Sequence, residues 1–133
     1  MRSHCPTNFA IEHFGDMWSL LIIRDMMFKG MRHYNEFLAA DENVSTSVLG
    51  NRLRTLVEYG LIRKGEDPVK KSRIRYSLTE KGIDLLPMMV EMIVWSGKYD
   101  ANTEAGGEFL HAAEHDREHL LARLRKGLIE THL

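Results

Sequence analysis

Hydrophobic residues recur at helical spacing through most of the chain, and they alternate with polar residues in one short stretch only. The spacing predicts three helices in the first part of the chain, over residues 6–15, 16–30 and 34–40. Pro6 suits the first turn of a helix and Gly15 its end, while Asp16 is a good cap for the helix that follows.

A fourth helix and a β-hairpin are predicted next. Ser45 is a good N-cap, and the helix that follows it ends at Gly60. Two β-like segments then cover residues 61–64 and 73–78, joined by a long tip over residues 65–72. In the second segment, the residues expected to face inward are Ile74, Tyr76 and Leu78.

Two long helices complete the chain. The first begins after Thr79 and runs through Pro87, where we expect a kink, to about Lys98. The second covers about residues 108–128.

This order of elements defines a fold class. It describes a mainly α protein with a small β-hairpin (α+β), a winged helix-turn-helix with extra helices at both ends. We expect one domain over residues 1–133, with an N-terminal dimer helix (1–15), the winged helix-turn-helix (16–81) and C-terminal dimerisation helices (82–133).

The helix after Ser45 has two faces of opposite character. Leu49, Leu53 and Leu56 form an aliphatic stripe, and short polar and basic residues lie on the other side. This balance is typical of a recognition helix, which docks by its apolar face and presents its N-terminal turn to bases in the major groove. The predicted DNA-contacting residues here are Ser45, Thr46, Ser47, Val48, Asn51, Arg52 and Arg54.

These residues suit different parts of a DNA duplex. Asn51 can pair with adenine, Arg54 can reach guanine or a phosphate, and Val48 can touch a thymine methyl group. The hydroxyls of residues 45–46 suit a phosphate, together with the amides at the start of the helix. Arg52 lies on the flank, where a phosphate contact and a structural ion pair both remain open.

Positive charge is confined to the middle of the chain. Residues 44–81 contain nine Lys and Arg against four Asp and Glu, whereas residues 1–43 and 82–133 are net acidic, at −2 and −4. A polyanion such as double-stranded DNA would therefore be met there. In the hairpin, basic side chains can grip the phosphate backbone and make binding salt-dependent. Those residues are Lys70, Lys71, Arg73 and Arg75.

The helix predicted over residues 79–98 is apolar nearly all round, so it must be buried on more than one side. A second copy of the chain is the expected cover, since a two-fold DNA site needs a protein dimer. Cover by the first and last helices of the same chain is the alternative. The candidate homodimer residues are Phe9, Met89, Ile93, Trp95, Leu120 and Leu124.

Composition narrows the function further. No apolar run approaches the roughly 18 residues of a membrane span and no signal peptide is evident, so we expect a soluble, cytoplasmic protein without a membrane partner. No glycine-rich phosphate loop, nucleophile elbow or carboxylate pair suggests an enzyme or a cofactor. The histidines His111, His115 and His119 face away from the apolar stripe of their helix, which favours a solvated face over a metal site.

Cys5 is the only cysteine. It precedes Pro6 at the start of the first helix, where the helix dipole, Arg2 and the N-terminal amine favour the thiolate form. Oxidation or capture of an electrophile is one hypothesis for it. The other is that Cys5 is a small residue packed against a dimer partner.

Taken together, these segments resemble the HxlR-type regulators over about residues 5–97. The resemblance implies a bacterial-type, homodimeric winged-helix transcription factor whose terminal helices form the dimer, with Cys5 at the position of a redox or electrophile sensor in several members. The motifs that carry it are Cys5-Pro6, residues 15–24 (GDMWSLLIIR), residues 34–37 (YNEF), Val44-Ser45 with Leu49 and Arg52-Leu53, residues 58–62 (EYGLI), residues 76–82 (YSLTEKG), Leu86-Pro87 and Trp95.

Some positions depart from the family pattern. Residues 41–43 lack the usual Pro-Gly, the wing has one proline where two or three are common, and Ser47-Val48 is an uncommon start to the recognition helix. These departures leave the operator sequence open. We therefore expect a sequence-specific regulator, such as a repressor, that binds a pseudo-palindromic operator as a homodimer. Two alternatives remain, a regulator that responds to a small-molecule effector without a thiol switch and a winged-helix module that binds only proteins.

Overall fold

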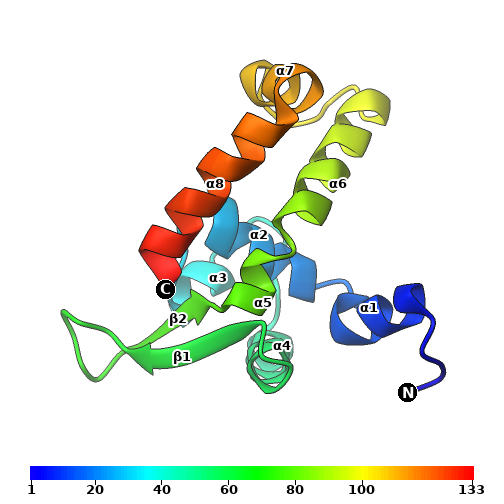
Figure 1. Cartoon of the computed structure of the whole chain (residues 1–133). Helices are drawn as coiled ribbons and strands as arrows, with labels where there is room; N and C mark the ends of the chain where they lie inside the picture. Colours follow the sequence, from blue (N-terminus) through cyan, green and yellow to red (C-terminus); the bar gives the residue numbers. More distant parts are fainter.

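Eight helices and one antiparallel hairpin make up the computed structural model, which describes all 133 residues (Figure 1). The mainly helical fold with a two-stranded hairpin confirms the predicted fold class. The helices are α1 (Pro6–Phe14), α2 (Ser19–Phe28), α3 (Tyr34–Leu38), α4 (Thr46–Glu58), α5 (Glu80–Ile83), α6 (Leu86–Tyr99), α7 (Gly107–His115) and α8 (Arg117–His132), and the strands are β1 (Ile62–Glu66) and β2 (Ile74–Leu78).

The elements fall into three parts. Helices α2–α5 and the hairpin form the lower body in Figure 1, and α6, α7 and α8 rise above it. Helix α1 projects from one side of the body and has no buried residue. None of the helices is long and apolar enough to cross a membrane.

The predicted caps explain where the early helices begin and turn. Asp16 Oδ1 accepts hydrogen bonds from the amides of Trp18 and Ser19, at 2.8 and 2.9 Å, and so satisfies two free donors at the start of α2. Gly60 ends α4 with a φ of 74°, a conformation that glycine adopts without strain. In the turn before α4, Asn43 has a φ of 57°, which asparagine tolerates better than most residues.

Two predicted helices are each divided in the structure. The expected kink at Pro87 is wrong, because the helix is interrupted before the proline, between α5 and α6. Pro87 occupies the first turn of α6, where its missing N–H costs nothing. The last predicted helix is broken at Asp116, whose extended φ of −149° separates α7 from α8. The break lets α7 pack on α6 while α8 turns back toward β2.

The hairpin pairs Ile62 with Leu78 at its base and Glu66 with Ile74 at its far end. The predicted alternation in β2 holds for Tyr76 and Leu78, which are buried, but it is wrong for Ile74, which is 48% exposed, and for Ser77, which is buried. Ile74 lies beyond the edge of the core, and both faces of the strand are covered at its base, where β2 also packs against α8.

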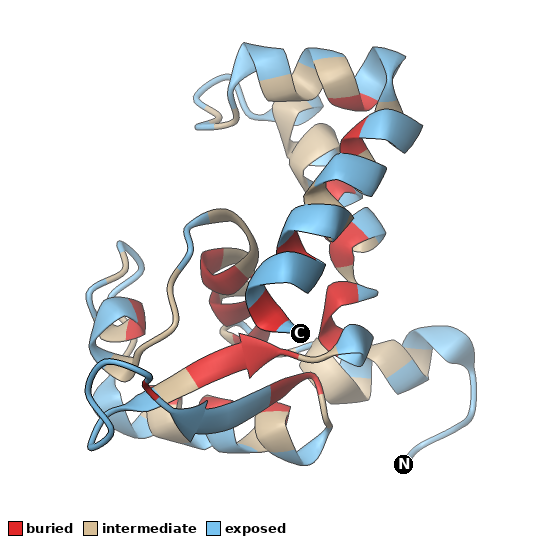
Figure 2. Ribbon diagram, turned by 60° about the vertical axis from the view of Figure 1, so that its left-hand side comes forward, coloured by how far each residue is buried: buried red, intermediate tan, exposed pale blue.

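One continuous core runs from the body into the C-terminal helices (Figure 2). The leucines of α4 meet α2 and Phe37 of α3 in the body, and the core continues upward through Val90 of α6 to α8. Met89 and Leu120, expected at a dimer interface, are instead 5% and 2% exposed and belong to this core. The sequence could not distinguish cover by a partner from cover by α7 and α8 of the same chain.

Candidate nucleic-acid interface

Helix α4 is divided sharply into a buried and a free side. Its three leucines, Leu49, Leu53 and Leu56, are at most 2% exposed, and burying each of them contributes about 1.5–3 kcal/mol. Ser45 Oγ accepts the amide of Val48 at 3.3 Å and fixes the first turn. The opposite side points away from the core, and its exposed residues are Ser45, Thr46, Ser47, Asn51 and Arg54.

Not all the polar residues of α4 are equally free. Arg52 forms an ion pair with Asp16 at 3.4 Å and donates a hydrogen bond to Asn51 Oδ1 at 2.5 Å. Arg52 thus joins α4 to the segment before α2 through a structural ion pair, one of the two roles expected for it. Arg54 forms no ion pair and is exposed, and Val48 is half-buried.

A second charged contact ties α2 to the turn that precedes α4. Arg24 donates two parallel hydrogen bonds to Glu42, at 2.7 and 2.8 Å, and also pairs with the buried Asp25 at 2.7 Å. The Arg24 hydrogen bonds lower the pKa of Glu42 to about 2. Because Glu42 lies in the turn that leads into α4, this bidentate contact orients the turn.

The tip of the wing is folded around Asp67, a 3% exposed residue. Its Oδ1 accepts the amides of Val69 and Lys70, at 2.8 and 3.0 Å, and its Oδ2 accepts from Arg73 at 3.0 Å. The Lys70 and Val69 amides hold the pKa of this carboxyl far below its usual range. Arg73 is therefore engaged within the wing, while the side chains of Lys70 and Lys71 are exposed.

His33 ties this tip to the helix-turn-helix. One ring nitrogen lies 2.6 Å from Asp67 Oδ2 and the other 2.6 Å from Glu36 Oε1. His33 is also the N-cap of α3, so the wing is attached to the start of that helix. The wing and the helix-turn-helix are consequently one connected unit.

The base of the wing is held by Arg32 and by the C-terminal helix. Arg32 donates to the carbonyl of Tyr76 at 2.7 Å and to Ser77 Oγ at 2.6 Å. His132, at the end of α8, accepts the Leu78 amide on Nδ1 at 3.0 Å, and its carbonyl accepts from Arg63. Helix α8 therefore contacts both strands of the wing near their base.

A concave surface separates α4 from the wing. It has a volume of about 200 Å³ and carries two basic side chains, Arg54 from α4 and Lys64 from β1. A Cβ atom on Gly50 would meet no atom within 4 Å, so this glycine widens the concavity and does not serve helix packing. Arg75, the last predicted wing contact, is half-buried near Arg32 and adds to the positive charge there.

Several of these residues escaped the sequence analysis. Arg32, His33 and Lys64 gave no local signal, because their partners are far away in the sequence. Asp67 before Pro68 is typical of a turn in which the side chain accepts backbone amides, and that signal was available.

Cys5 lies exposed at the start of the projecting helix α1. The amides of Asn8 and Thr7 lower the pKa of its thiol. Further along α1, the ring of His13 lies between those of Phe9 and Tyr59, with centroids 4.2 and 4.4 Å away. This stack is an aromatic contact between α1 and the body.

The remaining dimer candidates differ in exposure. Phe9 is 46% and Trp95 is 63% exposed, whereas Ile93 and Leu124 are half-buried. Along α6 the exposed large residues Met92, Trp95 and Tyr99 follow at spacings of three and four, which places them on one stripe. Met92 belonged to the predicted apolar helix but was not assigned to the interface, and Tyr99 lies just beyond the predicted end of that helix at about Lys98.

A helix with one polar face beside a basic wing defines a winged helix-turn-helix protein. Residues 13–104 match the family model described as HxlR-like helix-turn-helix. The chain belongs to this family, as its sequence motifs predicted, and its fold is that of the winged-helix regulators it resembles.

Relatives in several organisms carry matching names. The chain is 34% identical over 88 residues to the uncharacterized HTH-type transcriptional regulator sll1512 of Synechocystis, covering 66% of this chain and 64% of that protein. It is 37% identical over 90 residues to Rv3095 of Mycobacterium tuberculosis, covering 68% and 56%. It is 32% identical over 96 residues to YvaP of Bacillus subtilis, covering 71% and 88%. The matched segment therefore spans less than two thirds of the first two relatives.

Solved structures with the same fold include redox regulators. The putative transcription factor PA1607 has a TM-score of 0.69 at 31% identity, covering 79% of this chain and 72% of that one. The redox regulator HypR in its oxidized form has a TM-score of 0.63 at 25% identity, covering 76% and 100%. The reduced form of the transcriptional regulator YodB from B. subtilis has a TM-score of 0.59 at 25% identity, covering 77% and 100%.

Acid should weaken the contact between α8 and the wing. Burial, together with the nearby Arg32, lowers the pKa of His132 to about 4. His132 takes up a proton below about pH 6.5 in the unfolded chain, but only below about pH 4 in the folded protein. The contribution of neutral His132 to the free energy of unfolding is therefore fully present above pH 6.5 and is lost as the pH falls from 6.5 to about 4. We expect a loss on the order of 2–3 kcal/mol across that window.

Chemical denaturation at several pH values measures this loss. His132→Asn retains an acceptor for the Leu78 amide but does not titrate, so its stability should vary less with pH than that of the wild type. His111→Asn, on the exposed side of α7, is the matched control and should follow the wild type. Parallel pH profiles for His132→Asn and the wild type would contradict the assignment.

Proposed function

We propose that the chain binds duplex DNA through α4 and the wing, and that it regulates transcription as a homodimer on a pseudo-palindromic operator in the cytoplasm. The observation that carries the proposal is the one-sided burial of α4. All three of its leucines are buried, and its polar side is free beside two exposed lysines of the wing. This side has the size and chemistry to enter a major groove.

Within this proposal, base reading belongs to Ser47, Val48, Asn51 and Arg54. The hydroxyls and amides of residues 45–46 at the start of α4 bind phosphate. Arg52 orients the helix, since it pairs with Asp16. The grip on the phosphate backbone rests chiefly on Lys70 and Lys71 of the wing, because Arg73 pairs with Asp67 and Arg75 is half-buried.

Binding should depend steeply on salt, and the wing should supply part of that dependence. Each phosphate contact adds about 0.9 to the slope of log K against log salt, so Lys70→Gln with Lys71→Gln should reduce the slope by about 2. Fluorescence anisotropy with selected operator DNA at several salt concentrations measures it. The pair Lys98→Gln and Lys126→Gln removes two exposed lysines of α6 and α8 and should leave the slope unchanged.

The same experiment distinguishes the protein-binding alternative. Weak association that neither depends on salt nor distinguishes the operator from random duplex would favour a winged helix that contacts only other proteins. Arg54→Ala adds a test of base reading, since it should narrow the difference between operator and random DNA by about 1–3 kcal/mol.

The homodimer is proposed on the outer stripe of α6 together with α1. Trp95 and Tyr99 are 63% and 73% exposed on α6, and Phe9 is 46% exposed on a helix with no buried residue. Large apolar side chains in such a row are costly to leave in water. A two-fold partner that covers them also supplies the second recognition helix that an operator with two half-sites requires.

Placing a charge in this stripe should separate the protomers. In the proposed dimer Trp95 is an aromatic anchor covered by the partner, and Trp95→Glu puts a carboxylate in its place. Such anchors contribute about 2 kcal/mol or more, so the dissociation constant of the dimer should rise at least about thirtyfold. Sedimentation equilibrium measures the change. Ile129→Glu alters an exposed apolar residue of α8 and serves as the control. An unchanged dimer in the Trp95 variant would place the interface elsewhere.

The proposal also includes a thiol switch at Cys5. The amides of Asn8 and Thr7 favour the thiolate, which is the form that reacts. The similarity to the redox regulator HypR and to YodB supports a sensing role for this cysteine. Because the chain has no other cysteine, a disulfide between two protein thiols would have to join Cys5 of two protomers.

Diamide should convert the protein to a covalent dimer. Two Cys5 thiols would lose two electrons and two protons to diamide, which becomes the hydrazine, and a disulfide would form between them. A non-reducing gel shows the product, and operator affinity is measured before and after treatment. Cys5→Ser should stay monomeric on the gel and keep its affinity. Persistent monomer in the treated wild type would exclude the intersubunit disulfide.

A further inference from the structure

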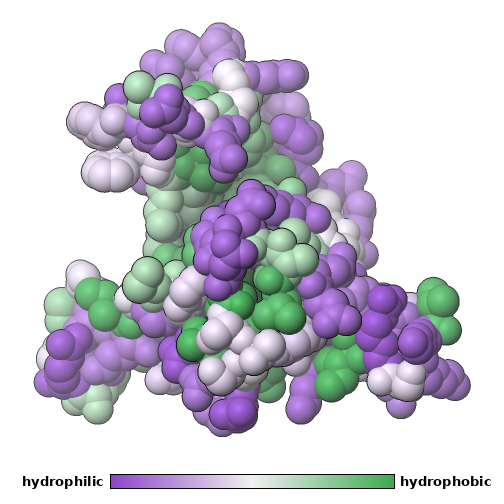
Figure 3. All heavy atoms as spheres, turned by 180° about the vertical axis from the view of Figure 1, so that it is seen from behind, coloured by the Kyte–Doolittle hydropathy of each residue, from purple (hydrophilic) through white to green (hydrophobic).

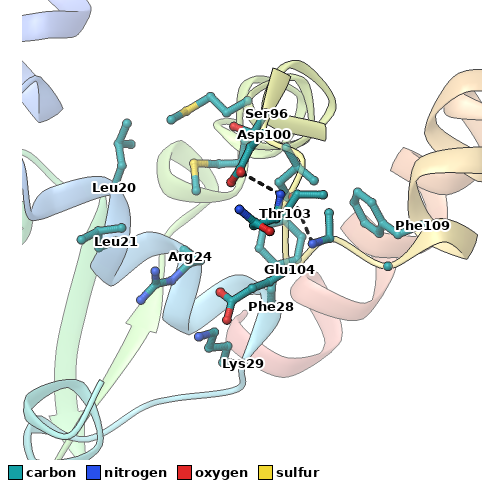
Figure 4. A pocket seen from close by; sticks show the side chains of 16 residues that line it. Leu20, Leu21, Arg24, Phe28, Lys29, Ser96, Asp100, Thr103, Glu104 and Phe109 are labelled. Carbon is teal, nitrogen blue, oxygen red and sulfur yellow. Dashed lines mark hydrogen bonds between the residues drawn. The ribbon is translucent and has the colours of Figure 1, made fainter. Parts of the chain in front are cut away.

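A groove lies between α2 and α6, but its charges single out no ligand. It has a volume of about 760 Å³ and is closed at one end by the connection between α6 and α7 (Figure 4). Seen from behind, apolar atoms gather between the upper helices and the body (Figure 3). The basic Arg24 and Lys29 are offset by Asp100 and Glu104 in the lining. A more specific arrangement begins at the cap of α2 and ends on the exposed side of α4.

Three side chains connect the cap of α2 to α4. Asp16 is fixed by the helix that it caps, because its Oδ1 accepts two backbone amides and its Oδ2 accepts the hydroxyl of Ser19 at 2.5 Å. The same Oδ2 lies 3.4 Å from the guanidinium of Arg52, which donates in turn to Asn51 Oδ1 at 2.5 Å. The side chains of Asp16 and Arg52 are both half-buried, so water weakens this ion pair less than a fully exposed one.

The guanidinium of Arg52 decides which end of the Asn51 amide is presented to a partner. A guanidinium has five N–H donors and no acceptor, so only the carbonyl end of the amide can face it. Asn51 itself is exposed on the side of α4 that lies away from the core. Its Nδ2 amino group is therefore the free end of the side chain, and this group can only donate.

The purine bases differ in how they would meet this arrangement. In the major groove guanine presents two acceptors, N7 and O6, whereas adenine presents the acceptor N7 and the amino donor N6. Pairing with adenine would turn Asn51 Oδ1 toward N6 and bring the guanidinium of Arg52 close to the same donor. At guanine the positive charge of Arg52 would lie near O6 instead, where it favours the contact.

We propose that Asp16 and Arg52 are positioning residues that make Asn51 a donor to guanine. This preference differs from the adenine contact expected from the residue type alone. The inference rests on the proposed function and deepens it, because it assigns a base to one position of each half-site. Asn51 touches the base, whereas Arg52 and Asp16 act only through Asn51.

Binding to operators that differ at single base pairs tests the inference on the full chain. Asn51→Ala identifies the base pair that Asn51 contacts, because discrimination is lost there. At this base pair the wild type should prefer guanine to adenine about tenfold, and Arg52→Met should shift the ratio toward adenine by about tenfold. Asp16→Asn keeps a good cap for α2 but removes the negative charge, so it should cause a smaller shift in the same direction.

A matched control separates this effect from a general loss of an arginine. Arg125→Met removes an arginine of α8 that pairs with Asp84, and it should leave the base preference unchanged. The melting temperature of each variant shows that it is folded at the temperature of the binding measurement. A wild-type preference for adenine, or a preference that Arg52→Met leaves unchanged, would overturn the inference.

A measurement without DNA keeps the inference distinct from the proposed function. Relaxation of the Asn51 side-chain ¹⁵N amide reports whether this amide is held in place. It should be ordered in the wild type and in Arg125→Met, and mobile in Arg52→Met. A mobile amide in the wild type would overturn the inference and leave the proposed function intact. Equal affinity of the wild type for every duplex would overturn the proposed function, and the inference with it.

Discussion

The burial of one side of α4 is the constraint on which the other features depend. A 13-residue helix with three leucines on a single stripe gains little by folding alone, and it is stable only when that stripe is covered. Helices α2 and α3 and the base of the hairpin provide the cover. The polar side is then left facing outward because nothing else in the fold can pack against it.

Sequence patterns were sufficient for this part of the molecule. The leucine stripe and the Ser45 cap are local signals, and each arises from interactions within a few residues. The positions of Ser47, Asn51 and Arg54 on the free side follow from the helical period once the buried stripe is known. Family motifs pointed to the same elements, and the match over residues 13–104 agrees with them.

Other features depended on tertiary packing. No glycine or proline marks the break at Asp116, and the apolar spacing continues across it, so α7 and α8 looked like one helix. They separate because α7 must pack on α6 while the end of α8 reaches β2. Likewise, His33 and Asp67 are 34 positions apart, and nothing local in either segment indicates the other.

The structure also separates positions that composition treats alike. Arg52, Arg73 and Arg24 are each committed to a carboxylate, whereas Arg54, Lys70 and Lys71 are free. Counting basic residues in the middle of the chain therefore overstates the charge available to a partner. Part of that charge, on Arg52 and Arg73, instead holds α4 and the wing tip in position.

The attachment of the wing tip to α3 through His33 and Asp67 has a further consequence for DNA. Because the wing and α4 are held as one unit, the distance between them is fixed. In the proposed complex this distance spans the edge of a DNA groove. A duplex must match that distance through its own width and bend. In the proposed DNA complex, base pairs that the protein never touches would influence affinity, because stiff and flexible steps differ in the energy needed to reach the required shape.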